Sequence, residues 1–213
     1  MKRRNFLKSL PVFAVAPLTL SANQKNASSS RHLIALGSAA CRLVYMNFKR
    51  LPFDTVTFID REEPGLIGDR QTFISFQSPD HLFDQVAHLK IPKMDCLPVL
   101  PLKPEIQRHL KSLEGDLVFL AGLGGVTSAL LFQSIGCHYF HSSQRMKWLA
   151  IMPFAFEGIR KEVRSQWAIR VLIEKKIDPT LFYLDEIRAK YGNLAIRSAY
   201  QRGDEWVVEE LLG

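Results

Sequence analysis

Apolar runs and polar segments alternate along the chain from residue 31 to its end. Short apolar runs typical of buried strands lie at residues 31–36, 56–60, 117–120, 148–152 and 180–184, with a weaker one near 72–76. Helical patterns separate or follow them, at residues 41–49, 79–89, 104–113, from 127 onward, and at 162–176, 185–191 and 194–212. This alternation predicts an α/β fold with a mainly parallel sheet covered by helices on both faces.

Two turns rich in small residues follow two of the predicted strands. Gly37-Ser38-Ala39-Ala40 follows the first strand, and Gly122-Leu123-Gly124-Gly125 follows the strand at 117–120 and leads into Thr127-Ser128. A glycine-rich turn before a helix leaves backbone N–H groups pointing toward a ligand above the helix, most often a phosphate. Glycine also ends strands for steric reasons alone, so a purely structural role stays open. Both turns are expected at the ligand-binding edge of a parallel sheet, and Asp60 ends a third strand there.

Charge argues against a nucleic-acid partner. The 213 residues carry a net charge of +7, but residues 1–30 hold five basic residues and no acid. The remaining body therefore has a net charge of only +2. A nearly neutral body lacks the basic surface that nucleic-acid binding requires.

The first thirty residues have the layout of an export signal. Met1-Lys-Arg-Arg-Asn-Phe-Leu-Lys8 resembles the twin-arginine motif, with Lys2 where Ser or Thr is usual. An apolar segment at 10–20, too short for a comfortable bilayer span, and the polar run 23–30 follow it. The leader predicts contact with the twin-arginine export machinery and a periplasmic protein, or one tethered to the inner membrane if the leader is not cut. The alternative is a basic tail on a cytoplasmic protein.

Other chemical motifs are weak. His138 and His141 form a pair, and His81, Asp84 and His88 could share one face of a helix, but a metal site needs three or four converging ligands. The chain has no Gly-x-Ser-x-Gly elbow, Walker lysine or Cys-x-x-Cys. We therefore predict neither a metal site nor a catalytic residue set.

Two segments together resemble a known family. DLVFLAGLGGVTSALL at 116–131 and AIMPFAFEGIRK at 150–161 look like the GTP-binding domain of the bacterial division protein FtsZ and its tubulin relatives. In that family the phosphate loop reads Gly-Gly-Gly-Thr-Gly-Thr/Ser-Gly, and the next strand ends in Pro-Phe-x-Phe-Glu-Gly followed by basic residues. The resemblance implies a three-layer, Rossmann-like fold and GTP or GDP as ligand.

The resemblance also implies the ligand contacts. The phosphates would meet the second turn at Gly122, Gly124, Gly125, Thr127 and Ser128, and the family's first loop corresponds to Gly37, Ser38, Ala39 and Ala40. Glu157 corresponds to the carboxylate that contacts ribose, and Lys161 to a basic residue that reaches phosphate. Tyr200 corresponds to the aromatic residue that stacks on guanine, and Asp204 to the residue that reads the guanine edge. A spacing of four places these last two on one helical face.

The chain departs from the family at several positions. Val126, Ala129 and Leu130 replace glycines and a hydroxyl of the phosphate loop, and Arg42 takes the place of an asparagine. The sequence stops at Gly213, before the family's acidic hydrolysis loop and second domain. We therefore expect a leader at 1–30, one nucleotide-binding domain at 31–213, and little or no hydrolysis unless a partner chain supplies the acidic group.

Two functions from different classes are compatible with these features. The first is a guanine-nucleotide-binding module that acts as a binding or scaffold protein and associates with itself or with another protein. The second is an exported or membrane-tethered protein that keeps the fold, has lost nucleotide, and recognises a protein partner or another small ligand. The lost glycines favour the second, whereas Tyr200 and Asp204 favour the first.

Overall fold

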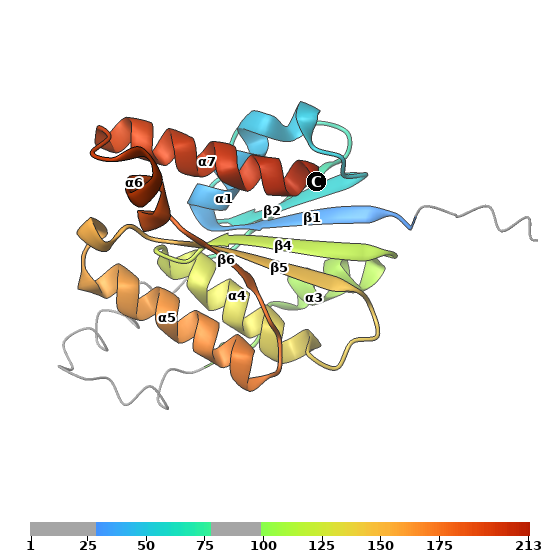
Figure 1. Cartoon of the computed structure of the whole chain (residues 1–213). Helices are drawn as coiled ribbons and strands as arrows, with labels where there is room; N and C mark the ends of the chain where they lie inside the picture. The colour runs from blue at the N-terminus through green and yellow to red at the C-terminus, as the bar shows by residue number, and fades with distance from the viewer. Residues whose placement is uncertain (1–28, 78–98) are drawn as a thin grey trace, which may run out of the picture.

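The computed structural model describes residues 29–77 and 99–213, which form a six-stranded parallel sheet covered by helices (Figure 1). The predicted leader and the predicted helix at 79–89 lie outside the described residues, apart from the last two residues of the leader segment. The strands follow the order β3-β2-β1-β4-β5-β6. Their bounds are Arg31–Leu36 (β1), Thr55–Asp60 (β2), Gln71–Ser75 (β3), Asp116–Gly122 (β4), Met146–Met152 (β5) and Thr180–Tyr183 (β6).

Helices cover both faces of the sheet. In Figure 1, α1 and α7 lie on one face, and α3, α4 and α5 lie on the other. The bounds are Gly37–Asn47 (α1), Pro104–Ser112 (α3), Val126–Tyr139 (α4), Ile159–Glu174 (α5), Asp185–Tyr191 (α6) and Ile196–Leu212 (α7), with short 3₁₀ turns at Phe48–Arg50 (η1) and Ala155–Glu157 (η3). The three-layer α/β fold expected from the alternating pattern is confirmed.

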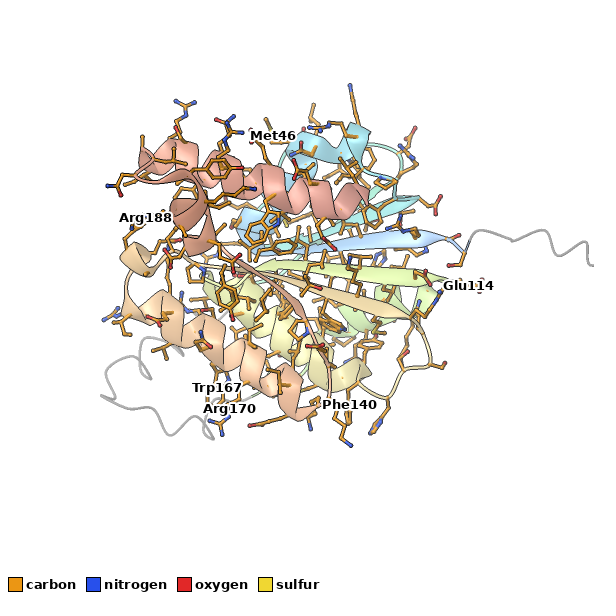
Figure 2. All side chains as sticks on the ribbon, viewed as in Figure 1. Met46, Glu114, Phe140, Trp167, Arg170 and Arg188 are labelled. Atoms are coloured by element: carbon orange, nitrogen blue, oxygen red, sulfur yellow. The ribbon has the colours of Figure 1, made fainter. Side chains whose placement is uncertain are left out.

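Alternate residues of each strand enter two separate cores. Leu33 and Ala35 of β1 pack with α1 and α7, whereas Ile34 and Leu36 pack with α3, α4 and α5. This is the two-residue period of a strand with both faces buried, and it explains why the strands read as continuous apolar runs. Figure 2 shows side chains from both helical layers extending toward the sheet.

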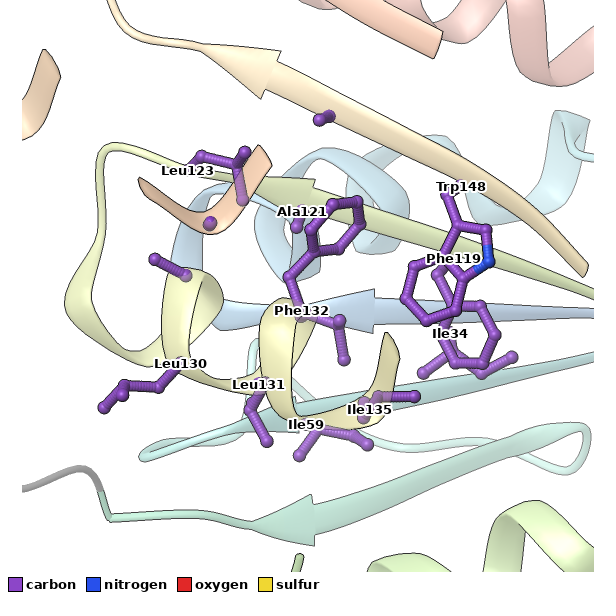
Figure 3. Close-up of a cluster of buried hydrophobic side chains, with 14 of the residues drawn as sticks. Ile34, Ile59, Phe119, Ala121, Leu123, Leu130, Leu131, Phe132, Ile135 and Trp148 are labelled. Carbon is purple, nitrogen blue, oxygen red and sulfur yellow. The ribbon is translucent and has the colours of Figure 1, made fainter. Parts of the chain in front are cut away.

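Aromatic rings hold the centre of the larger core (Figure 3). Phe119 of β4 stacks on Trp148 of β5 with ring centres 4.4 Å apart, and Phe132 of α4 meets Trp148 edge-on at 5.2 Å. These contacts fix α4 against the two central strands. The start of α4 is therefore held by its own buried side chains, independently of any ligand.

Two helices begin earlier than their apolar pattern predicts. α1 starts at Gly37, so the first small-residue turn is the first turn of the helix and not a separate loop. α5 starts at Ile159, directly after Gly158, whose φ of 102° ends the preceding 3₁₀ turn. Along the described part of the chain, no helix combines the length and the apolar character needed to cross a membrane.

Candidate functional site

A cavity of about 790 Å³ lies at the carboxyl-end edge of the sheet. The strands β1 and β4 are hydrogen-bonded neighbours there, although they are not consecutive in the chain. α1 leaves β1 toward one face and α4 leaves β4 toward the other. Such a reversal of strand order opens a crevice at the ends of the strands, which is the usual ligand position in parallel sheets.

Most of the residues predicted to contact a nucleotide line this single cavity. They come from the start of α1, the turn before α4, the segment after β5 and the middle of α7, and they are Gly37, Ser38, Ala39, Gly122, Gly124, Gly125, Thr127, Ser128, Glu157, Lys161, Tyr200 and Asp204. Ala40 is the exception. Its side chain is fully buried beneath α1 with Leu43 and Val44, so it supports the helix and does not face the cavity.

The starts of α1 and α4 approach each other closely because small residues line both. Gly37 has a φ of 76°, and a Cβ atom built on it would lie 2.8 Å from Cβ of Ser128. A Cβ atom built on Gly122 would likewise lie 2.9 Å from Cβ of Ala39. Glycine is therefore required at residue 37 both for its backbone conformation and for space.

The start of α4 presents backbone donors to the cavity. The N-cap residue, Gly125, makes no side-chain cap, and the first turn contains no acidic residue. An α-helix leaves its first amide groups, here including those of Val126 and Ser128, without an acceptor inside the helix. Together with the helix dipole, these amides favour an anion at this end of the cavity.

The hydroxyl of Ser128 is engaged with the glycine turn. Its Oγ donates to the carbonyl oxygen of Gly122 and lies 3.0 Å from that of Gly125. The side chain is also buried, with 3% of the residue exposed. Ser128 therefore stabilises the glycine turn, and only its amide remains a candidate for contact with a ligand.

Arg164 of α5 also holds the glycine turn. Its Nη1 donates to the carbonyl oxygen of Gly124 across 2.6 Å. A charged donor makes a stronger hydrogen bond than a neutral one. No local sequence pattern marks this residue, because the contact joins positions forty residues apart.

Glu157 lies at the centre of a hydrogen-bonded cluster beside the glycine turn. Its Oε1 accepts from the amide of Phe154 at 2.9 Å, and its Oε2 lies 2.6 Å from Nζ of Lys161. The hydroxyl of Tyr200 also interacts with the carboxylate and helps to lower its pKa. Burial works to raise the pKa of Glu157, but these three donors outweigh it and hold the pKa below its usual range.

The ring of Tyr200 is held in place by this cluster. Its edge packs against Phe154, with ring centres 5.1 Å apart and the planes at 90°. Burial and the hydrogen bond to Glu157 raise the pKa of its hydroxyl. The residue keeps 36% of its surface exposed and lines the cavity, so the ring is a fixed, accessible apolar surface.

Asp204 lies one helical turn beyond Tyr200 and faces a cation. Burial raises the pKa of its carboxyl group, Arg42 of α1 opposes this rise through its positive charge, and Glu205 adds to it. Both Arg42 and Asp204 line the cavity. This end of the cavity therefore places an acceptor and a donor of opposite charge near the exposed tyrosine ring.

The end of β2 and the loop after it add charges to the site. The cavity is lined there by Asp60, the last residue of β2, and by Arg61, Glu62 and Glu63. Only Asp60 is predicted from the sequence to lie at this edge of the sheet, because it ends a strand. With Glu157 and Asp204, the lining has five acidic residues against three basic ones. The side chains alone are therefore net negative, and any attraction for a phosphate has to come from backbone amides and from the local placement of the three basic side chains.

Comparison with known proteins identifies the fold. Neither a family model nor a curated protein matches the amino-acid sequence. Solved structures do match: FtsZ from M. jannaschii, determined as an empty dimer, has a TM-score of 0.66 at 11% identity, covering 89% of this chain and 55% of FtsZ. CetZ1 from Haloferax volcanii, a GDP-bound monomer, has a TM-score of 0.59 at 15% identity, covering 84% of this chain and 58% of CetZ1.

A phage protein shows the same likeness. TubZ from bacteriophage PhiKZ has a TM-score of 0.51 at 12% identity, covering 83% of this chain and 59% of TubZ. This chain thus spans a little over half the length of the solved structures that it matches. At these low identities the likeness concerns architecture, and the chain has the fold of the nucleotide-binding domain of FtsZ, CetZ and TubZ.

Proposed function

We propose that this protein is an FtsZ-like module that binds guanine nucleotide, GTP or GDP, with little or no hydrolysis, and acts as a binding or scaffold protein. The observation that supports the proposal most strongly is that residues from distant positions in the sequence line the same cavity. Twelve residues assigned from two motifs, the first small-residue turn and one helix, spread between positions 37 and 204, line one cavity at the switch point of the sheet. A fold kept only for stability has no need to gather them there.

The phosphate end of the proposed site is made of backbone. The uncapped start of α4 supplies amides, and Ser128 and Arg164 fix the turn that aims them. Lys161 adds one flexible charge at its edge, 45% exposed and paired with Glu157. Backbone amides at a helix start bind phosphate without side-chain charge, which suits a lining that is net negative.

The base end is made of side chains. The fixed ring of Tyr200 supplies a stacking surface, and Asp204 accepts from the N1–H and amino groups of guanine. Adenine presents a ring nitrogen acceptor where guanine presents N1–H, so a carboxylate favours guanine. Ribose would lie between the two ends, near Glu157.

One of the five cavity carboxylates, Glu157, is unsuited to support hydrolysis, because donors already engage both of its oxygens. A general base must be free to orient a water molecule. The scaffold role is supported by the assembly of similar proteins, since CetZ2 from Haloferax volcanii is known as a GTPγS-bound protofilament.

The deciding experiment is calorimetric titration of the full chain with GTP, GDP and ATP, together with mass analysis of material released by denaturing the protein purified from its own host. We expect GTP and GDP to bind and ATP to bind at least about tenfold more weakly. Phosphate release from bound GTP should be slow or undetectable. Equal binding of GTP and ATP, or no binding at millimolar concentration, would contradict the proposal.

One observation favours a second candidate, a protein that keeps this fold for a protein partner or another ligand. The cavity lining holds two more acids than bases, and Lys161 is already paired with Glu157. This candidate fits an exported protein, because the periplasm offers almost no GTP. Changing Arg3 and Arg4 to Lys should then retain the protein in the cytoplasm, and unchanged distribution in cell fractions would count against export.

A further inference from the structure

Buried polar side chains gather near the amino ends of β1 and β2, at the edge of the sheet opposite the cavity. His32 of β1 and Thr57 of β2 are 7% and 1% exposed, and His109 of α3 is half-buried. α3 packs against the sheet through Ile106 and Leu110, which enter the larger core. A buried polar group needs a hydrogen-bond partner, so the contacts of these side chains affect how firmly α3 is held.

His109 joins α3 to β2. Its Nε2 lies 2.8 Å from Oγ1 of Thr57, a contact between positions 52 residues apart. As a neutral ring, His109 can accept the hydrogen bond that the Thr57 hydroxyl donates. The helix therefore supplies the partner of a hydroxyl that the strand buries.

His32 joins β1 to the segment that follows α3. Its Nε2 lies 2.8 Å from the carbonyl oxygen of Glu114, and its Nδ1 lies 2.7 Å from Oγ1 of Thr55. A carbonyl oxygen can only accept, so Nε2 donates, and Nδ1 of the neutral ring accepts from the Thr55 hydroxyl. The two histidines thus hold both the end of α3 and the connection from α3 to β4.

Both rings fit their surroundings as neutral groups. A proton added to His32 would go to Nδ1 and would turn the Thr55 hydroxyl from a donor into an acceptor. A proton on His109 would bring a positive charge into a half-buried site. Burial lowers the pKa of His109 most, the positive charge of His32 lowers it further, and the negative charge of Glu105, one turn earlier on α3, opposes this lowering.

The elements around the two histidines carry charges of both signs. The charged and titratable groups there are Arg31 and Asp54 at the strand starts, Glu105, Arg108 and Lys111 on α3, Glu114 and Asp116 near the start of β4, and Tyr139 on α4. β3 carries no charged residue. Asp116 pairs with Arg145 at 3.0 Å, which leaves Glu105 as the main negative charge that acts on His109.

We propose that His32 and His109 form a pH-sensitive switch, which holds α3 and the segment after it on the sheet while both rings are neutral and releases them in acid. The folded protein binds a proton on His109 more weakly than the unfolded chain does. The contribution of His109 to stability is therefore fully present above the usual histidine pKa of about 6.5 and is lost as the pH falls below it. The switch is independent of the proposed nucleotide function, because neither histidine belongs to the cavity lining.

The test is hydrogen–deuterium exchange of the full chain between about pH 8 and about pH 5, with each rate corrected for the intrinsic pH dependence of amide exchange. Peptides that cover residues 104–115 are compared with peptides from α5, whose buried residues enter the same core. We expect the protection of 104–115 to fall at least about fivefold across this range. The protection of α5 should change by less than about twofold.

His109→Gln separates titration from packing. It removes the titrating ring and keeps an amide group that can donate to or accept from the Thr57 hydroxyl. In this variant the acid-induced loss of protection at 104–115 should shrink to less than about twofold. His138→Gln is the matched control, because it replaces an exposed histidine of α4 and should leave the pH profile unchanged.

Three outcomes would overturn the inference. If the unaltered chain keeps the protection of 104–115 down to about pH 5, acid does not release α3, and this result requires no variant to fold. If α5 loses as much protection as 104–115, acid destabilises the whole fold and α3 does not respond separately. If His109→Gln keeps the full pH dependence, as His138→Gln should, then groups other than His109 cause it.

Discussion

The two ends of the cavity are built on different principles. The end formed by α1 and α4 consists of backbone amides and of glycines that let two helix starts approach. The end formed by α7 consists of side chains, Tyr200 and Asp204, with Arg42 also in the cavity lining. The backbone path determines which groups line the first end, and the identity of the side chains determines which groups line the second.

This difference shows where the sequence can change without loss of the site. Val126, Ala129 and Leu130 replace family glycines at the backbone end, yet α4 still begins at the glycine turn, with Leu130 and Ala129 buried in the core. Backbone donors survive such replacements as long as the close approaches at Gly37 and Gly122 are kept. At the α7 end, each substitution would remove a side-chain contact of the proposed base site.

The backbone end should fail most severely when its closest approach is filled. Gly37→Ala places a methyl group against Ser128 and forces alanine into a positive φ, so we expect about 2–5 kcal/mol of lost stability from strain and overpacking together. Ser128 would also have to leave its bonds to the turn, which removes nucleotide binding. Urea denaturation followed by circular dichroism measures the first effect, and titration with GTP the second.

Gly192→Ala separates conformational strain from crowding. Gly192 has a φ of 75°, close to that of Gly37, but a Cβ atom there meets nothing within 4 Å. Gly192→Ala should lose only the free energy of unfolding that backbone strain costs, about 1–3 kcal/mol. The folded variant should keep its affinity for GTP. Equal losses of stability in both variants would show that the approach of α1 to α4 is not tight.

The α7 end should lose affinity without losing the fold. Asp204→Ala removes a charged acceptor from the cavity lining, and we expect guanine nucleotide to bind about 10- to 150-fold more weakly. Glu205→Ala is the control, because it removes the same charge from the next residue, where the side chain pairs with Arg202 at 2.7 Å on the surface. If the two variants weaken GTP binding alike, Asp204 acts through charge alone.

Acid should affect Asp204 before Glu157, because the pKa of Asp204 is raised and that of Glu157 is lowered. The pKa of Asp204 is raised by burial, so lowering the pH from about 7 toward about 4 protonates it sooner than an ordinary aspartate. The preference for GTP over ATP should then fall by about tenfold or more. The contribution of Asp204 to stability should rise at the same time, because its partly buried carboxyl destabilises the fold only when it is ionised. Titrations at each pH measure this, and Asp204→Asn should show a flat profile.

The sequence predicted the fold well because strand periods and turn residues are local signals. Apolar runs located every strand, and the Phe154-Ala-Phe-Glu-Gly158 motif located Glu157 without knowledge of the fold. Helix starts were less accurate at α1, because a glycine with positive φ can occupy the first position of a helix as well as a loop before it. The residue pattern does not distinguish these two cases.

The parts of the site that were missed depend on contacts between distant positions. Arg164 reaches Gly124 across forty residues, and the acidic loop after β2 meets the cavity only because β2 and β4 flank β1. The bonds from Ser128 to its own turn were missed for another reason. A serine in that position fits a phosphate contact and a turn contact equally well, and only coordinates separate the two.

Thr127→Ala should have the smallest effect on GTP affinity of these substitutions, and it tests how the backbone end differs from the α7 end. Thr127 lines the cavity in the first turn of α4, and its hydroxyl is a neutral group beside several backbone amides. If backbone amides are the main contacts of the phosphates, Thr127→Ala should cost about 1 kcal/mol of binding free energy, which is near fivefold in GTP affinity. The losses for GTP and GDP should be equal if the hydroxyl contacts only phosphates that both nucleotides have. Thr127→Ser should restore most of the affinity, since it keeps the hydroxyl. A loss as large as that of Asp204→Ala would show that side chains, and not the path of the chain, determine binding at the backbone end as well.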